Sequence, residues 1–289
     1  MTNNRSKIQK AAEIFLLFAA FIYLCGGTKI NTVLPNELTI LMYHNLIDRG
    51  EPDELSISQK KFYEDMKWLG ENGFHTILPN ELCALRANGK PLPEKTVMVV
   101  FDDGYYSNYS LAFPVLKETG MKAAVMLITS QIKDSEPTND PRVAMLCWRD
   151  VKEMSESGLI EFGSHSHNLH NPDQCGEFIP GKGKSNGIQR LRNETRKNYR
   201  IRLDADIKRS VSLIYEHTGQ NVVSFAFPFG VADEWANDVL RQNGIRVTFL
   251  TGNQVADLGK GLFNLKRVGI HEYTDISKLL RAGASVGRL

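Results

Sequence analysis

The sequence has 289 residues, of which 42% are hydrophobic and 24% are charged, and its formal net charge is +2. These proportions are typical of a soluble globular protein and exclude a disordered, collagen-like or multi-span membrane chain. The balanced charge gives no argument for nucleic-acid binding, so we expect no nucleic-acid partner, and four cysteines are too few for a disulfide-stapled scaffold.

The N-terminal segment is the first distinct feature of the chain. Basic residues precede an apolar stretch at 14–24, which is the pattern of a secretory signal. Residues 11–27 also reach the lower length limit of a membrane-spanning helix. We expect 1–30 to be a signal peptide or an N-terminal membrane anchor, with a buried helix as the alternative. Either of the first two makes the remainder extracytoplasmic, membrane-anchored or secreted, where Cys147 and Cys175 could pair.

Short apolar runs alternate with helical patterns after residue 35. The runs predict strands at 39–44, 74–77, 96–101, 123–128, 159–164, 222–227, 247–250 and 262–268. Helices are expected from a Ser58 cap to Gly73 and at 80–87, 111–119, 149–157, 204–217, 233–243 and 275–282. This alternation predicts a parallel sheet of the α/β class. Seven or eight units favour a barrel over an open doubly wound sheet.

A basic insertion at 171–200 interrupts the alternation. It is rich in Gly, Asn, Lys and Arg. One interpretation is a solvated loop that leads into a helix. The other is a contact with an anionic polymer or a membrane surface.

The strongest chemical signal is the sequence FDDG at 101–104, directly after an apolar strand. Side chains at the C-terminal end of a parallel strand point into the ligand-binding crevice. Adjacent residues there point in different directions, so that one of Asp102 and Asp103 can bind a metal while the other acts as a base. An Asp-Gly turn with a capping Asp is the alternative.

The second signal is SHSHNLH at 164–170, which holds three of the seven histidines. On a strand His165 and His167 share one face, and His170 could fold back after a short turn. Two histidines and a carboxylate leave open positions on a divalent metal, as in a hydrolytic zinc site, although other divalent ions fit.

The third signal is FAFPFG at 225–230, a strand that ends in a Pro/Gly loop. Backbone N–H groups in such a loop can face a developing oxyanion. An ordinary turn is the alternative interpretation.

Together the three motifs resemble those of the polysaccharide deacetylase family, the NodB-homology carbohydrate esterases of family 4, from about residue 38 to 280. Met42-Tyr43-His44 and Trp148 look like the poly-β-1,6-N-acetylglucosamine deacetylase branch. The resemblance implies that 36–289 form a polysaccharide deacetylase domain, folded as a distorted (β/α) barrel with its site at the strand C-termini.

The resemblance also implies roles for individual residues. Asp103, His165 and His170 would be the ligands of a divalent metal, first of all zinc. Asp102 would be the general base and His271 the late catalytic acid. The backbone around Phe229 would help to hold the oxyanion.

Further aromatic residues complete the expected site. Tyr105, Tyr106 and Trp148 could form a sugar-stacking floor with Phe229, with plain packing as the alternative. The sequence does not assign a role to His44, which is expected near the site.

The motifs depart from the commoner family pattern in three places. His165 and His170 are five apart rather than four, which leaves His165 with His167 as a second choice of ligands. Ala226 stands where the family has an arginine that orients the catalytic aspartate. His271 lies in a Gly-Ile-His-Glu context rather than the usual one.

The expected activity is metal-dependent hydrolytic deacetylation of N-acetylated sugars in a cell-envelope or extracellular polysaccharide, such as poly-N-acetylglucosamine or peptidoglycan. The first alternative is a catalytically weak or inactive carbohydrate-binding relative. An amidohydrolase barrel would place H-x-H after the first strand, and a glycosidase needs carboxylates about 5–9.5 Å apart across the bond, so both fit less well.

Overall fold

The computed structural model describes residues 36–134, 144–170, 187–191 and 193–280, all within the unit Leu34–Leu289. The predicted N-terminal segment at 1–30, Cys175 and the first half of the basic insertion lie outside the described residues. Within the described residues, no helix combines the length and apolar character that a membrane crossing requires.

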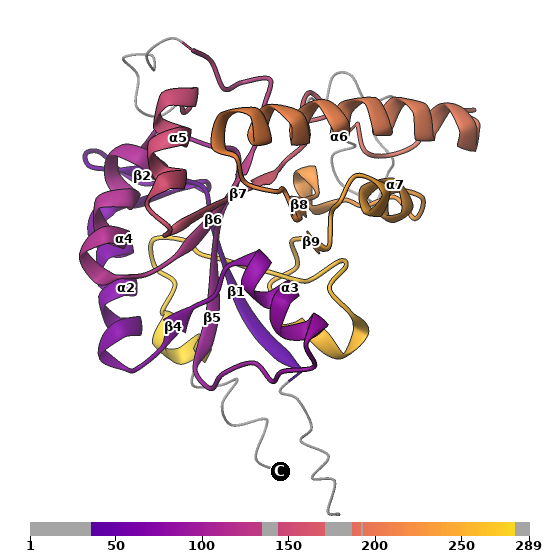
Figure 1. Ribbon diagram of the computed structural model, residues 1–289. Coiled ribbons are helices and arrows are strands. Elements are labelled where there is room, and N and C mark those ends of the chain that lie inside the picture. The colour runs from indigo at the N-terminus through magenta and orange to yellow at the C-terminus, as the bar shows by residue number, and fades with distance from the viewer. Residues whose placement is uncertain (1–35, 135–143, 171–186, 192, 281–289) are drawn as a thin grey trace, which may run out of the picture. The chain divides into compact units, whose positions relative to one another are not determined.

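The order of strands and helices follows the predicted alternation (Figure 1). Three short strands, at 45–47, 56–58 and 256–257, were not predicted, and the run at 262–268 forms only a bridge at Leu265 and the start of a strand at Val268. The described strands are β1 (Glu37–Tyr43), β2 (Asn45–Ile47), β3 (Ser56–Ser58), β4 (His75–Thr76), β5 (Thr96–Phe101), β6 (Ala123–Leu127), β7 (Ile160–Ser164), β8 (Ser224–Ala226), β9 (Val247–Phe249), β10 (Ala256–Asp257) and β11 (Val268–Gly269). The described helices are α2 (Gln59–Glu71), α3 (Pro79–Ala87), η1 (Asn108–Ala112), α4 (Phe113–Thr119), α5 (Trp148–Glu156), α6 (Arg196–Thr218), η3 (Pro228–Gly230), α7 (Ala236–Gln242) and η4 (Leu258–Lys260).

The main sheet is a distorted (β/α) barrel, as predicted. Strands β1, β5, β6, β7, β8 and β9 are parallel neighbours in that order. The segment after β10 closes the circle, because Leu265 bridges to Phe249 of β9 and β11 pairs with Leu41 and Met42 of β1. The C-terminal ends of all these strands therefore meet at one end of the barrel.

Alternating side chains divide the core into an interior and an outer layer. On β5, Met98 and Val100 belong to the cluster inside the barrel, whereas Val97 and Val99 pack against the helices. Successive side chains of a strand point to opposite faces, which produces this division. The same alternation on β7 turns Glu161 inward, since its neighbours Ile160 and Phe162 belong to the outer layer.

The helices cover the outside of this sheet. In Figure 1, α2, α4 and α5 lie along one flank and α6 and α7 along another. The predicted cap of the first helix is confirmed, because the Ser58 side chain accepts a hydrogen bond from the Lys61 N–H. Helix α6 begins at Arg196, eight residues before the predicted start, so the end of the basic insertion is helical.

Candidate active site

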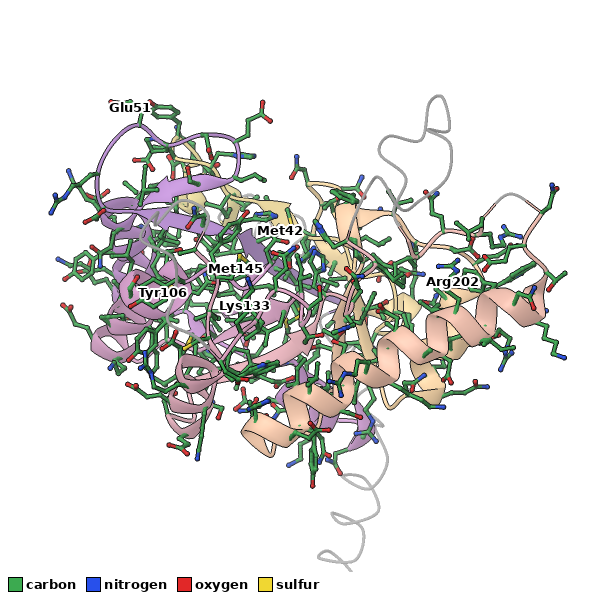
Figure 2. The ribbon with its side chains drawn as sticks, turned by 90° about the horizontal axis from the view of Figure 1, so that it is seen from above. Met42, Glu51, Tyr106, Lys133, Met145 and Arg202 are labelled. Atoms are coloured by element: carbon green, nitrogen blue, oxygen red, sulfur yellow. The ribbon has the colours of Figure 1, made fainter. Side chains whose placement is uncertain are left out.

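Each of the three motifs leaves a strand of the barrel at the same end. Asp102 follows β5, His165 follows β7, and Phe229 lies in η3 just after β8. Parallel strands deliver their C-terminal residues to one face, where ligand sites of such folds lie. Figure 2 looks onto this face from above.

Asp103, His165 and His170 come together as a group that could hold a metal ion. Asp103 Oδ1 lies 3.5 Å from His165 Nε2 and 3.6 Å from His170 Nε2, and the candidate ligand atoms all lie within 4.8 Å of one another. Asp103 Oδ1 is buried and accepts no hydrogen bond from the described residues. A buried carboxylate oxygen without a donor, facing two imidazole nitrogens, fits a divalent cation.

The two histidines are in the protonation state that metal binding requires. Burial lowers the pKa of His165 to about 3, although the nearby Asp102 opposes this shift. His165 Nδ1 lies 2.8 Å from the Ala226 carbonyl oxygen, so in the neutral ring Nδ1–H donates there and Nε2 keeps its lone pair towards Asp103. Burial also lowers the pKa of His170.

Asp103 itself has a raised pKa in the absence of a cation. Burial raises the pKa of its carboxyl to about 6; the charge of Asp102 adds to this shift, and His44 opposes it. A cation at this position would favour the ionised carboxylate, because an opposite charge lowers a carboxyl pKa.

Asp102 has a different partner, Arg267, which the sequence analysis did not identify. Arg267 Nη1 and Nη2 donate to Asp102 Oδ1 and Oδ2 at 2.7 and 2.8 Å, and both side chains are buried. Burial alone would raise the pKa of Asp102, but the charge and hydrogen bonds of the Arg267 guanidinium hold it well below its usual range. Asp102 therefore stays ionised.

This ion pair bears on the departure at Ala226. Asp102 has an arginine partner although Ala226 cannot supply one, because Arg267 reaches it from the segment between β10 and β11. The available signal was weak, because Arg267 stands beside Lys266 in the strand predicted at 262–268 and the sequence does not show which of the two is buried. Such a residue is costly to bury unless it is paired.

Backbone strain gathers at the three motif ends. Asp103, Ser166 and Phe229 have left-handed φ angles of 73°, 73° and 56°. Residues other than glycine rarely adopt this conformation, and where they do they cluster at functional sites. At Gly230, an added Cβ would lie 2.0 Å from Thr251 Oγ1, so only glycine fits there.

His44 lies beside the carboxylates at the end of β1. Its electrostatic influence reaches both Asp102 and Asp103. The Asn108 side-chain amide donates to the His44 carbonyl oxygen at 2.9 Å. Asn108 begins a π-helical turn, a feature often found at functional sites.

The predicted aromatic residues lie in different surroundings. Tyr105 makes a side-chain hydrogen bond with Asp103, and burial raises the pKa of Tyr105 to about 12. The backbone of Tyr105 forms a bridge with Met145, and the Tyr106 N–H donates to the Ala144 carbonyl oxygen at 2.8 Å; Met145 and Tyr106 are labelled in Figure 2. Phe229 packs on His170 with ring centroids 4.4 Å apart.

Trp148 starts α5 and is buried. Its ring stacks on the His217 ring with centroids 4.2 Å apart, so both rings are in a packing contact. Cys147, which could pair with Cys175 in an exported domain, is buried, and Cys175 lies outside the described residues.

The other two candidate histidines, His167 and His271, are not part of the ligand group. The His167 ring faces the Thr129 hydroxyl at 3.0 Å. His271 follows β11, is exposed, and its backbone N–H donates to Thr274 Oγ1 at 3.0 Å.

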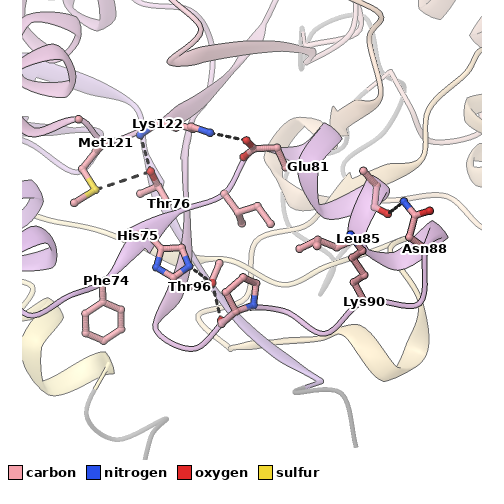
Figure 3. Close-up of a pocket in the computed structure, with 14 residues that line it drawn as sticks. Phe74, His75, Thr76, Glu81, Leu85, Asn88, Lys90, Thr96, Met121 and Lys122 are labelled. Atoms are coloured by element: carbon pink, nitrogen blue, oxygen red, sulfur yellow. Dashed lines mark hydrogen bonds and ion pairs between the residues drawn. The ribbon is translucent and has the colours of Figure 1, made fainter. Parts of the chain in front are cut away.

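A separate cavity of about 590 Å³ lies at the other end of the barrel strands (Figure 3). It is lined by the start of β5, by β4 and by α3, with an ion pair between Glu81 and Lys122 at its edge. His75 lines it and bonds Thr96 Oγ1 at 2.8 Å. The cavity contains none of the motif residues.

Comparison with known proteins gives consistent results. The family model described as polysaccharide deacetylase matches residues 89–248. The chain is 28% identical to a poly-beta-1,6-N-acetyl-D-glucosamine N-deacetylase of Escherichia coli (strain K12) over 235 residues, which are 77% of this chain and 35% of that protein. It is 27% identical to the enzyme of the same name from Staphylococcus epidermidis over 67% of this chain and 61% of that protein.

A solved structure is similar over most of its length. A de-N-acetylase from Aggregatibacter actinomycetemcomitans superposes with a TM-score of 0.69 and 26% identity, covering 85% of this chain and 99% of that one. The matches to the curated relatives are partial, since the chain spans about a third of the E. coli protein and less than two thirds of the S. epidermidis one.

Proposed function

The chain belongs to the polysaccharide deacetylase family, and from this we propose that it hydrolyses the N-acetyl groups of N-acetylated sugars in a cell-envelope or extracellular polysaccharide, with poly-N-acetylglucosamine ahead of peptidoglycan. The names of the E. coli and S. epidermidis relatives support this order of substrates. The predicted signal or anchor at 1–30 is part of the same proposal, because it would place the domain where such polymers occur.

The observation that carries the proposal is the pairing of two unlike carboxylates. Asp102 is ionised and held by Arg267, while Asp103 Oδ1 faces His165 and His170 without a hydrogen bond. Asp103, His165 and His170 would hold a divalent cation, which we propose to be zinc. When bound, zinc polarises a carbonyl and lowers the pKa of water from 15.7 to about 7.

The protein's own groups would then carry the proton transfers. Asp102 accepts the proton of the water that attacks the amide carbon, and its bond to Arg267 keeps it oriented and ionised. Backbone N–H groups around Phe229 would stabilise the oxyanion. Tyr105 would contact the sugar chain, whereas Trp148, which is buried and stacked on His217, fits the packing alternative.

A protonated group must supply a proton to the leaving nitrogen. His271 is the residue proposed from the sequence, and His44 is a second candidate because its charge acts on both Asp102 and Asp103. The alkaline limb of the pH–rate profile separates them: alanine at the acid removes that limb, and alanine at the other histidine leaves it.

The test is acetate release by the full-length protein from β-1,6-linked and β-1,4-linked N-acetylglucosamine oligomers. We expect release that a chelator abolishes and zinc restores, with the preferred linkage indicating the polymer. Asp102→Asn should keep zinc and lose about 10²–10⁴-fold in turnover, whereas Asp103→Ala should lose both. Asp204→Asn, on the outer helix α6, is the matched control. An active Asp102→Asn enzyme would refute the base assignment.

A further inference from the structure

The turn between His165 and His170 belongs to neither a strand nor a helix. Ser166 is fully buried and left-handed, and its Oγ accepts from the Leu169 N–H at 3.1 Å. Backbone N–H groups of an irregular turn have no ladder to pair with, so other parts of the protein must bond them.

One side of this turn is held by the loop after β6. The Thr129 N–H donates to the Ser166 carbonyl oxygen at 3.2 Å, and the Ser130 N–H donates to the His167 carbonyl oxygen at 3.1 Å. These are backbone bonds, and no single side chain supplies them.

The other side of the turn is held by one carboxylate, that of Asp206. The consecutive N–H groups of His167 and Asn168 donate to Asp206 Oδ1 and Oδ2, each at 2.8 Å. Successive N–H groups beside a left-handed residue form a concave anion site. Bonds to an ionised acceptor are about twice as strong as neutral ones.

Asp206 reaches the turn from a distant part of the chain. It lies within helix α6, 38 residues beyond Asn168. The rigid helix therefore fixes the middle of a turn whose two ends are the proposed metal ligands. His165 and His170 are five residues apart, so the turn between them is one residue longer than a spacing of four would make it.

We propose that Asp206 is a positioning residue that sets the separation of His165 and His170 and thereby the affinity of the site for a divalent cation. The proposal rests on the metal site of the proposed function. Both carboxylate oxygens of Asp206 accept from the turn, and Asp206 takes no part in proton transfer.

The first test is the zinc affinity of the full-length protein, measured by competition with a chromophoric chelator. Asp206→Asn places an amide N–H₂ against one of the two backbone donors, so zinc should bind about 10–100-fold more weakly. Asp204→Asn is the matched control. Asp204 lies on the same helix but bonds Lys208 and Asn243, away from the turn. The zinc affinity of the Asp204→Asn variant should therefore stay within about twofold of the wild-type value.

Kinetics give a second readout. Excess zinc should restore most of the kcat of Asp206→Asn while KM for the oligomer stays unchanged, because the substrate groups are intact. Asp206→Glu keeps both acceptor oxygens and should recover part of the zinc affinity. A general loss of folding would instead lower kcat at every zinc concentration, and that result would overturn the proposal.

A third readout does not depend on the metal. In the metal-free protein, hydrogen–deuterium exchange of the peptide covering 165–170 should be faster in Asp206→Asn than in Asp204→Asn. Equal exchange, or zinc affinity equal to that of the control, overturns the proposal. If the wild-type protein neither binds zinc nor releases acetate, the proposed function fails, and exchange still decides whether Asp206 holds the turn.

Discussion

Asp102 and Glu161 are both buried carboxylates of the barrel, but they lie at opposite ends of it. Asp102, at the C-terminal end of β5, accepts two hydrogen bonds from Arg267. Glu161, near the N-terminal end of β7, accepts one from the Asn80 N–H, and its Oε1 has no hydrogen-bond partner among the described residues. Arg267 holds the pKa of Asp102 low despite burial, whereas burial raises that of Glu161 to about 8.

The difference follows from what each end requires. A general base must be ionised at neutral pH, so its burial has to be offset by a buried cation. Glu161 bonds the N-terminal turn of α3, where the Leu78 side chain has no oxygen to cap the helix. A neutral carboxyl still accepts that bond, so no cation is needed.

The largest effect is expected from removing the positive charge of Arg267. Arg267→Met should lower the free energy of unfolding by about 3–5 kcal/mol at pH 7, because it leaves Asp102 ionised and unpaired in the core. The loss should shrink in acid as Asp102 takes up a proton. Urea unfolding at pH 7 and pH 4 measures both values.

Lys266→Met controls for the lost charge, since Lys266 adjoins Arg267 but lies on the half-buried side of the segment. Equal losses in the two variants would mean that the ion pair contributes no specific stability.

Replacing Glu161, at the opposite end of the barrel, should raise stability rather than lower it. Burial raises the pKa of Glu161 from its ordinary value of 4.5 to about 8 in the folded protein, so the folded state binds this proton more tightly. Its contribution to stability is complete below pH 4.5 and is lost as the pH rises through 8. Glu161→Gln mimics the protonated form and should stabilise the protein by about 2–3 kcal/mol at pH 9 and hardly at all at pH 4.5.

Thermal or urea unfolding across this pH range measures the effect. Glu81→Gln is the control, because Glu81 is a half-buried carboxylate of α3 that pairs with Lys122. A Glu161→Gln protein with an unchanged pH profile would show that Glu161 is ionised in the fold.

Gly163 lies between the two ends, midway along β7. An added Cβ would lie 2.4 Å from Ser224 Oγ and 2.5 Å from Met126 Sδ. Gly163→Ala should therefore destabilise the protein by about 1–3 kcal/mol through overpacking of the barrel interior. Gly158→Ala has open space around its Cβ but a left-handed φ of 71°, so it separates backbone strain from overpacking. A neutral Gly163→Ala would mean that the barrel expands there.

The smallest predicted effect concerns the pH dependence of zinc binding. Asp103, with a pKa of about 6 in the metal-free protein, is the ligand that takes up a proton first as the pH falls. Zinc affinity should be constant above pH 6 and fall about tenfold per unit below it, about 1.4 kcal/mol per unit. Calorimetric titration between pH 5 and 7.5 measures this slope. A flat profile would mean that Asp103 is ionised before the metal binds.

The central strands could be predicted from the sequence because a strand buried on both faces is a continuous apolar run. The apolar run at 96–101 has the same bounds as β5, and the histidine and aspartate motifs start where their strands end. The start of α6 was missed because its first turns are charged and read as a loop. Its inward side chains pack only through distant partners, such as the Tyr199 hydroxyl that donates to the Ile188 carbonyl oxygen.

By itself, then, the sequence determined the order of strands and helices, the common end at which the motifs lie, and the residue types that suit a divalent metal, since all of these depend on neighbours along the chain. Only the tertiary structure decided that Arg267 pairs with Asp102, 165 residues away, and that Asp206 holds the turn between the histidines. Both contacts exist because the closing barrel and its outer helix bring distant segments together. A local sequence pattern does not show which distant side chain will pair with a buried charge.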